Sequence, residues 1–133
     1  MTMIFSNVAL RAAIANGDLR ISPLDDSSID KAHVDLHIDI ADSAEALSIP
    51  ARGFIIARTL ETITLSPKLC AFMEGRSSLA RLGLSIEQSS TFIEPGSNNK
   101  MVLEIYNASS EDIVLKHGQP IAKLFVVRVT DTY

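Results

Sequence analysis

The chain has 133 residues, of which 47% are hydrophobic, 21% charged and 5% aromatic. This composition excludes a disordered or fibrous chain, and the length suits one domain over residues 1–133 with a core of its own. The net charge of −4 argues against a nucleic-acid partner, because duplex-binding proteins usually display a basic face.

Cysteine content and hydropathy bear on location. Cys70 is the only cysteine, so neither a disulfide framework nor a cysteine-rich zinc site is expected, and a cytoplasmic location is predicted. No apolar run reaches about 18 residues, and residues 1–9 lack the basic and long apolar regions of a signal peptide. Neither membrane insertion nor export is therefore expected.

A short surface helix is predicted near the start of the chain. Leu10 and Ile14 have the spacing of one apolar helical stripe. Ser6 or Asn7 suits the N-cap, and Gly17 suits the left-handed residue that follows a helix.

From Ile21 onward the pattern is typical of short strands separated by turn residues. The expected strands are His33–Ile40, Gly53–Arg58, Thr62–Leu65, Leu69–Glu74, Leu84–Gln88, Met101–Tyr106, Ile113–Leu115 and Ile121–Val129. Such spacing favours a β-sandwich, jelly roll or barrel. The exception is Ser77–Gly83, which is predicted to form one short helical turn, capped by serine and ended by glycine.

The first candidate site lies in residues 74–84, which read EGRSSLARLGL. A helix start presents unpaired N–H groups and a partial positive charge, so Arg76, Ser77 and Ser78 together suit a phosphate. Ser77 and Arg81 are four residues apart and share a helical face. An ordinary cap with solvated arginines is the alternative, and the local pattern alone favours it.

The second candidate is Glu104. Strand alternation places it on one face with Val102 and Tyr106. Burial raises the pKa of a carboxyl and suits it to proton transfer near neutral pH. The alternative is the solvent face of a half-buried strand, where a single Glu is more often found.

Residues 33–39 place polar side chains on one strand face, which first suggests a metal site. His33 and His37 would lie about 13 Å apart along an extended strand, too far to share one ion. Asp35 with His37 would need a third ligand from elsewhere. A polar strand face, with Asp35 bonding to a neighbouring turn, is the favoured interpretation.

Two turns complete the pattern. Pro95 and Gly96 occupy the second and third positions of a predicted type II turn, and Glu94 stands at its mouth. His117 is interpreted as a residue of a second turn at 116–120. The single cysteine excludes the Cys-x-x-Cys pair of zinc-dependent base deaminases, and no Walker loop or Gly-rich dinucleotide fingerprint occurs.

The order of these segments resembles the deoxyuridine triphosphatase and dCTP deaminase superfamily, and the dCTP deaminase branch most closely. Residues 74–84 are similar to the signature of that branch nearly letter for letter. Residues 92–96 (FIEPG) resemble its Ile-Asp-Pro-Gly turn, and 102–107 (VLEIYN) its catalytic Leu-Glu strand. Weaker likeness extends to 9–23, 34–36 and 115–124.

This resemblance implies a mainly β, dUTPase-like fold: a distorted barrel or jelly roll with an N-terminal helix and one short helix. It implies hydrolytic deamination of dCTP to dUTP and ammonia, metal-free at the base, with Glu104 as general base and acid. Ser77 and Arg81 would orient the water and stabilise developing charge, and Arg76 and Ser78 would bind phosphate.

The resemblance also implies a homotrimer with sites between subunits. The nucleotide would arrive as its Mg²⁺ complex, with the ion held mainly by phosphates rather than protein ligands. Glu94 stands where the family has an Asp that contacts the deoxyribose, and Lys123 stands where Gln is frequent. The sequence stops at Tyr133, where the family continues into a tail that wraps the triphosphate. A dUTP pyrophosphatase and a non-catalytic nucleotide-binding trimer are the alternatives.

Overall fold

The computed structural model describes residues 3–40, 45–88, 91–131 and 133. Its elements, in chain order, are α1 (Asn7–Asn16), β1 (Leu19–Ser22), the 3-10 turn η1 (Asp26–Ser28), β2 (Val34–Asp39), β3 (Ala46–Ile49), β4 (Phe54–Leu65), β5 (Leu69–Gly75), α2 (Ser77–Ala80), β6 (Leu84–Ser85), β7 (Phe92–Ile93), β8 (Asn98–Asn107), β9 (Ile113–Lys116) and β10 (Pro120–Arg128). The predicted fold class, mainly β with an N-terminal helix and a short second helix, is confirmed.

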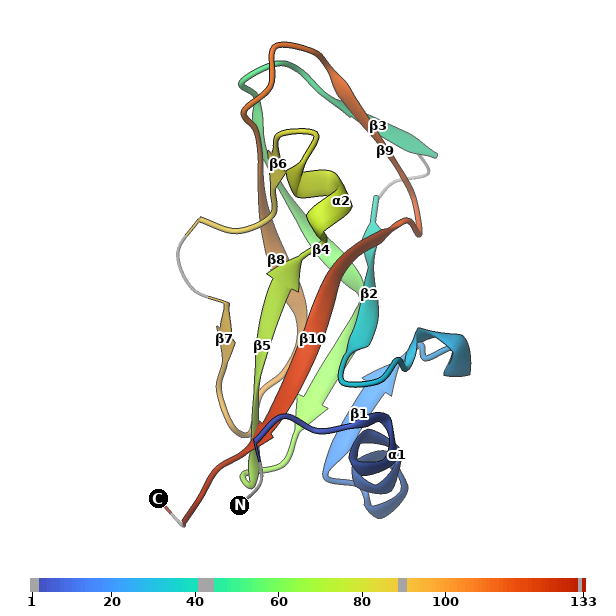
Figure 1. Ribbon diagram of the computed structural model, residues 1–133, viewed down its shortest axis with the longest axis vertical. Helices are drawn as coiled ribbons and strands as arrows, with labels where there is room; N and C mark the ends of the chain where they lie inside the picture. Colours follow the sequence, from blue (N-terminus) through green and yellow to red (C-terminus); the bar gives the residue numbers. More distant parts are fainter. Residues whose placement is uncertain (1–2, 41–44, 89–90, 132) are drawn as a thin grey trace.

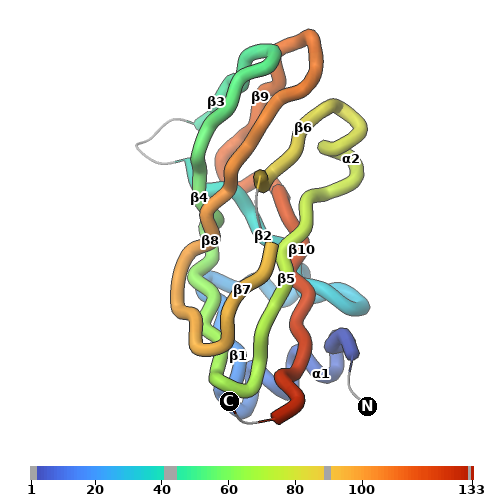
Figure 2. The backbone as a smooth tube through the Cα atoms, turned by 90° about the vertical axis from the view of Figure 1, so that its left-hand side faces the viewer, coloured from blue at the N-terminus to red at the C-terminus, as the bar shows by residue number. Residues whose placement is uncertain are grey.

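An antiparallel sheet with strand order β6-β8-β4-β2-β10-β5-β7 forms the body of the molecule, and β1 pairs in addition with β4. Figure 1 shows α1 and β1 at one end and the separate β3–β9 ribbon at the other. The sheet curls into a half-barrel, so that β4 and β8 lie on one side and β5 and β10 on the other (Figure 2).

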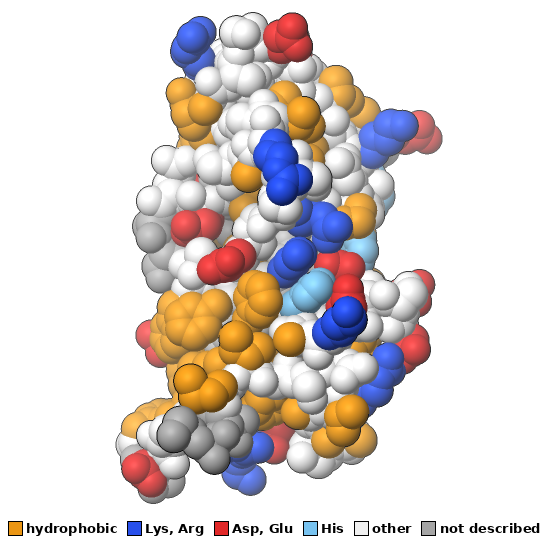
Figure 3. All heavy atoms as spheres, in the orientation of Figure 1, with side chains coloured by type: hydrophobic (Ala, Val, Ile, Leu, Met, Phe, Trp, Pro, Cys, Tyr) orange, Lys and Arg blue, Asp and Glu red, His pale blue; other side chains and the backbone are white. Residues whose placement is uncertain are grey.

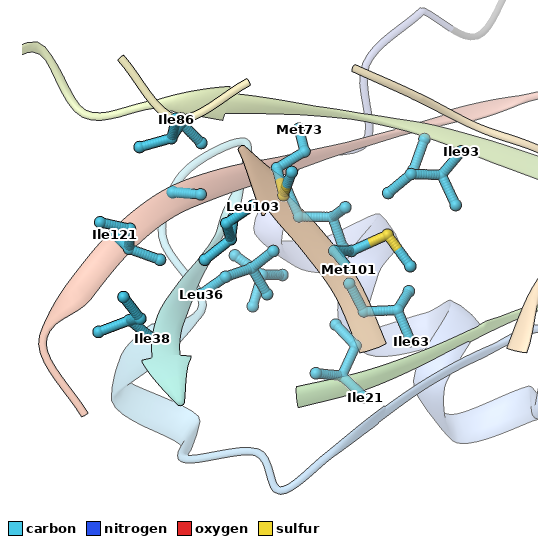
Figure 4. Close-up of a cluster of buried hydrophobic side chains, with 14 of the residues drawn as sticks. Ile21, Leu36, Ile38, Ile63, Met73, Ile86, Ile93, Met101, Leu103 and Ile121 are labelled. Atoms are coloured by element: carbon cyan, nitrogen blue, oxygen red, sulfur yellow. The ribbon is translucent and has the colours of Figure 1, made fainter. Parts of the chain in front are cut away.

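Buried aliphatic side chains fill the space inside this curl. Leu36 of β2, Ile63 of β4, Leu103 of β8 and Ile121 of β10 are all fully buried, and Figure 4 shows side chains from these strands converging. Alternation along each strand sends these residues inward and their neighbours outward. Burial of this apolar surface is the main term that stabilises the sheet.

The predicted helix α1 is confirmed with its caps. The Ser6 hydroxyl accepts a hydrogen bond from the Ala9 N–H at 3.2 Å, and Gly17 ends the helix in the left-handed region. Leu10 and Ala13 are buried against the sheet end. In the part of the chain that the structure describes, no helix is long and apolar enough to cross a membrane.

The sequence analysis predicted two strands, 53–58 and 62–65, where the structure has the single strand β4. The predicted gap coincides with a change of register between Arg58 and Thr62. At this irregularity the buried Thr59 hydroxyl donates to the Glu61 carbonyl at 2.8 Å and accepts from the Met101 N–H at 2.9 Å. These bonds replace ladder hydrogen bonds and keep β4 continuous. The short strands β1 and β3 were not predicted.

The predicted type II turn links β7 to β8. The Ser97 N–H donates to the Glu94 carbonyl at 3.2 Å, and Gly96 has φ +78°. A positive φ at the third position is the feature that favours glycine in this turn. The turn thereby places Glu94 at the end of β7, which pairs with β5, before the chain enters β8, which pairs with β4 and β6.

Candidate active site

The segment that the sequence analysis singled out first forms the junction between β5 and α2. Arg76, not a serine, occupies the N-cap of α2, with extended backbone (φ −84°, ψ 135°) and no side-chain capping bond. The predicted serine cap is therefore wrong. Ser77 and Ser78 form the first turn of the helix instead, and both are exposed.

The predicted proximity of Ser77 and Arg81 is confirmed along the backbone, since the Arg81 N–H donates to the Ser77 carbonyl at 3.0 Å. Residues one helical turn apart lie on the same side of the helix. Arg81 is exposed like Ser77. Both can therefore reach a ligand that approaches α2.

Arg76 is held by a carboxylate from another strand. Its Nη1 donates to Asp35 Oδ1 on β2 at 2.9 Å, and His33 Nε2 lies 3.2 Å from the same oxygen. Asp35 was expected to bond to a neighbouring turn; it bonds instead to the start of α2. We call these three residues the Asp35 cluster. Figure 3 shows basic, acidic and histidine side chains gathered near the middle of this face.

A hollow of about 340 Å³ lies beside the cluster. Arg76, Glu74, Ser85, Glu87 and Thr91 are among the residues that line it. Glu87 Oε2 is buried and accepts no hydrogen bond from the residues described. This hollow therefore combines a cation with hydroxyl groups and acceptors, a lining suited to a polar ligand.

Glu104 lies on the outward face of β8 and is half-buried. Its Oε1 accepts a hydrogen bond from the Gln88 N–H at 3.2 Å, and its register partner on β4 is Ile56. Ile56 is 67% exposed and Val102, on the same face of β8, is 50% exposed. Two apolar side chains that a single chain leaves uncovered thus flank the carboxylate.

Glu94 is not brought to Arg76 within one chain. Ile93 is the register partner of Ala71 on β5, so Glu94 lies near Cys70, six residues before Arg76 and about 20 Å away along the strand. Burial, and secondly the Glu94 charge, raises the pKa of the Cys70 thiol. One chain therefore presents the predicted site residues in separate places.

The sequence analysis missed the buried residue Glu61. Its Oε1 accepts from the His37 N–H at 2.9 Å, and its Oε2 lies 2.6 Å from His37 Nδ1. Glu61 shares the phase of the buried residues Ile63 and Leu65 in β4. A Glu in the buried phase of a strand was the signal that could have revealed it.

Two histidines near β2 pair with different carboxylates. His33, just before the strand, faces Asp35, and His37, within it, pairs with Glu61. Across the described residues, no group of three or more His, Cys, Asp or Glu side chains is placed to hold a metal ion. The donor set that the structure offers is therefore one of hydrogen bonds and single charges.

Residues 38–129 match the family model described as dCTP deaminase-like. The chain belongs to this family. The "dCTP deaminase, dUMP-forming" of Sulfurihydrogenibium sp. (strain YO3AOP1) is 34% identical over 155 aligned positions, covering 97% of this chain and 86% of that protein. The protein of the same name from Aquifex aeolicus (strain VF5) is 32% identical, covering 96% and 82%. The predicted superfamily and the prediction of an enzyme are confirmed.

Solved structures agree on the fold. The deaminase of 2'-deoxycytidine 5'-triphosphate from Agrobacterium tumefaciens superposes with a TM-score of 0.80 at 19% identity, over 96% of this dCTP deaminase-like chain and 49% of that chain. This chain thus spans about half the length of that protein. The EIAV dUTPase superposes with a TM-score of 0.64 at 23% identity, over 86% and 90%. The dUTPase-like fold is confirmed.

Proposed function

We propose that this chain removes the amino group of dCTP by hydrolysis. The observation that carries the proposal is the placement of Glu104, in a chain of the dCTP deaminase-like family. Its carboxylate is half-buried, oriented by the Gln88 N–H and flanked by apolar side chains. A carboxylate positioned in this way can act as general base and general acid.

In the proposed reaction Glu104 takes a proton from water, and the hydroxide forms a bond to C4 of cytosine. The proton then passes from Glu104 to the amino group, the C4–N bond breaks and ammonia leaves. The proton of the C4 hydroxyl moves to ring nitrogen N3, so that a carbonyl remains at C4. Ser77 and Arg81, one turn apart on α2, orient the water and stabilise the charge that develops.

Arg76 and Ser78 bind the phosphates in this proposal. The Arg76 guanidinium uses Nη1 for Asp35 and has further N–H donors for a ligand. Mg²⁺ would arrive with the triphosphate, whose oxygens would hold it. When bound, the ion neutralises part of the phosphate charge.

We further propose a homotrimer in which adjacent protomers share each site. The exposed Ile56 and Val102 beside Glu104 are typical of an interface, because monomers rarely leave large apolar patches uncovered. A deoxyribose lies next to its phosphates, so Glu94 and Arg76 of one chain, about 20 Å apart along β5, cannot both contact one nucleotide. A partner chain would supply the missing side.

The names of the relatives bear on the product of the reaction. The sequence predicts dUTP, whereas the two relatives described above are both called dUMP-forming. These names favour a second candidate, a combined reaction in which dCTP and two waters give dUMP, ammonia and pyrophosphate.

Incubation with dCTP and Mg²⁺ tests the proposal by ammonia release and chromatography of the nucleotides. We expect ammonia in step with either dUTP or dUMP, and Glu104→Gln to lower its release by about 10²- to 10⁴-fold. Glu111→Gln, at an exposed carboxylate, is the matched control. Absence of ammonia, or full activity of Glu104→Gln, would remove the proposal. Pyrophosphate released from dUTP alone would favour the pyrophosphatase, and binding without turnover the non-catalytic trimer.

A further inference from the structure

We infer that His33 is a positioning residue for the phosphate site, whose protonation releases Arg76 from Asp35 and tightens phosphate binding as the pH falls. The inference rests on the proposed function in one respect, the assignment of Arg76 to phosphate. No part of the family resemblance assigns a role to His33. Its basis is the geometry of the Asp35 cluster.

One oxygen atom faces two nitrogen partners in this cluster. Asp35 Oδ1 accepts from Arg76 Nη1 at 2.9 Å and lies 3.2 Å from His33 Nε2. A charged imidazole binds a carboxylate more strongly than a neutral one does, because charge-assisted hydrogen bonds are about twice as strong. Protonation of His33 therefore weakens the hold of Asp35 on Arg76.

His33 is also fixed in place, which such a role requires. Its side chain is 16% exposed, its carbonyl accepts from the Asp30 N–H at 2.9 Å, and its ring lies 6.0 Å from that of Phe125 between centroids. A ring confined in this way exchanges partners by changing charge rather than by moving away. The contact with Asp35 therefore persists in both protonation states.

The charges around the cluster give the sign of the effect. With a neutral imidazole, the charges of Arg76 and Asp35 cancel; with a charged imidazole, the cluster carries one net positive charge. Among the described residues, the other charged groups near it include Lys123, register partner of Asp35; Glu74, register partner of Lys123; Asp30, 3.9 Å from His33 Nε2; His37, which pairs with Glu61; and Glu87, which lines the hollow with Arg76. Histidine is the side chain that ordinarily changes charge between about pH 5 and 8, so the lysine and carboxylate charges stay fixed over that interval.

The test uses inorganic tripolyphosphate, which has no base and cannot be deaminated. Its own protonation varies with pH, so wild type and His33→Gln are compared at each pH by calorimetry. Gln keeps an N–H donor for Asp35 but does not titrate. We expect wild type to gain about three- to tenfold in affinity over His33→Gln between pH 8 and 5.5. His117→Gln, which removes a histidine lying 3.7 Å from Asp39, should follow wild type.

A second measurement uses the wild-type protein, so it does not depend on the folding of a variant. Binding and protonation are reciprocal, so tripolyphosphate should raise the pH at which the His33 ring becomes charged in NMR titrations, and leave the His117 ring unchanged. Equal pH dependence of wild type and His33→Gln, or no NMR response, would overturn the inference while leaving deamination intact. Unchanged binding by Arg76→Gln would instead refute the phosphate assignment itself, and the inference with it.

Discussion

Asn107, at the end of β8, is the buried amide on which the anchoring of the Glu104 strand depends. Its Nδ2 donates to the carbonyls of Ile49 at 3.0 Å and Glu111 at 2.8 Å. Its Oδ1 accepts from the Ser109 N–H at 2.9 Å and hydroxyl at 2.7 Å. A hydrogen bond contributes about 1 kcal/mol net, and a buried group left without a partner costs about 1–3 kcal/mol. Because some of the released groups can reach water, Asn107→Ala should lower the free energy of unfolding by about 2–4 kcal/mol.

Asn107→Asp distinguishes hydrogen bonding from mere loss of volume. The new oxygen would face the carbonyls of Ile49 and Glu111, where the amide now donates. Burial and these carbonyls would raise the pKa of the introduced carboxyl in the folded state above its unfolded value of about 3.9. Below the unfolded-state pKa the introduced carboxyl is protonated in both states, so this contribution to stability is fully present. The contribution is lost as the pH rises through the folded-state pKa and the buried carboxyl ionises. Asn107→Asp should therefore be less stable than Asn107→Ala at pH 7, and the gap should narrow towards pH 4.

Urea unfolding followed by circular dichroism at one protein concentration measures these differences. Asn99→Ala is the control, because Asn99 is exposed and its contact with Ser97 is 3.5 Å long; we expect a change below about 0.5 kcal/mol. If Asn107→Asp were as stable as wild type at pH 7, or more stable than Asn107→Ala, the donor assignment would be refuted.

Two further predictions concern the outer face of β4 and the buried thiol. Ile56→Asp should dissociate the proposed trimer in sedimentation experiments without unfolding the chain. Val114→Asp, at a comparably exposed position on β9, should leave assembly unchanged. Dissociation of both variants or of neither would contradict the proposed interface. Burial and the Glu94 charge raise the pKa of the Cys70 thiol. The reactive thiolate therefore forms at higher pH than in an unfolded chain. Iodoacetamide should alkylate native protein at pH 8 at least tenfold more slowly than protein in urea. Glu94→Gln should make native alkylation faster at the same pH, and an unchanged rate would exclude an effect of that charge.

Local signals were sufficient for much of the fold. The caps of α1 and the Pro95–Gly96 turn depend on residues within a few positions of one another, and both were predicted correctly. The same is true of the inward and outward phases of β2 and β8. These features need no knowledge of the rest of the chain, because capping, turn geometry and alternation are properties of short segments.

Features set by distant partners were not predictable in this way. The serine cap of α2 was a reasonable expectation, but Arg76 takes the cap position while its side chain binds Asp35, 41 positions away in the sequence. Glu61 and His37 are 24 positions apart, and only strand pairing brings them together. A single sequence gives the polar character of such residues but not the pairing that decides what each one binds.

The location of the site also depends partly on local motifs and partly on distant partners. Motif likeness places Arg76 and Glu104 in one function, yet Arg76 points towards Asp35 of β2 whereas Glu104 lies among exposed apolar residues on the outer face of β8. If one chain formed the whole site, those apolar residues would stay in contact with water. Exposed aliphatic surface costs free energy in water, so this arrangement is unfavourable. The apolar surroundings of Glu104 are best explained if a neighbouring protomer excludes water there. In the proposed trimer, the exclusion of water that suits a carboxylate to proton transfer depends on the neighbouring protomer. Dissociation by Ile56→Asp should therefore abolish ammonia release even with every proposed catalytic side chain intact.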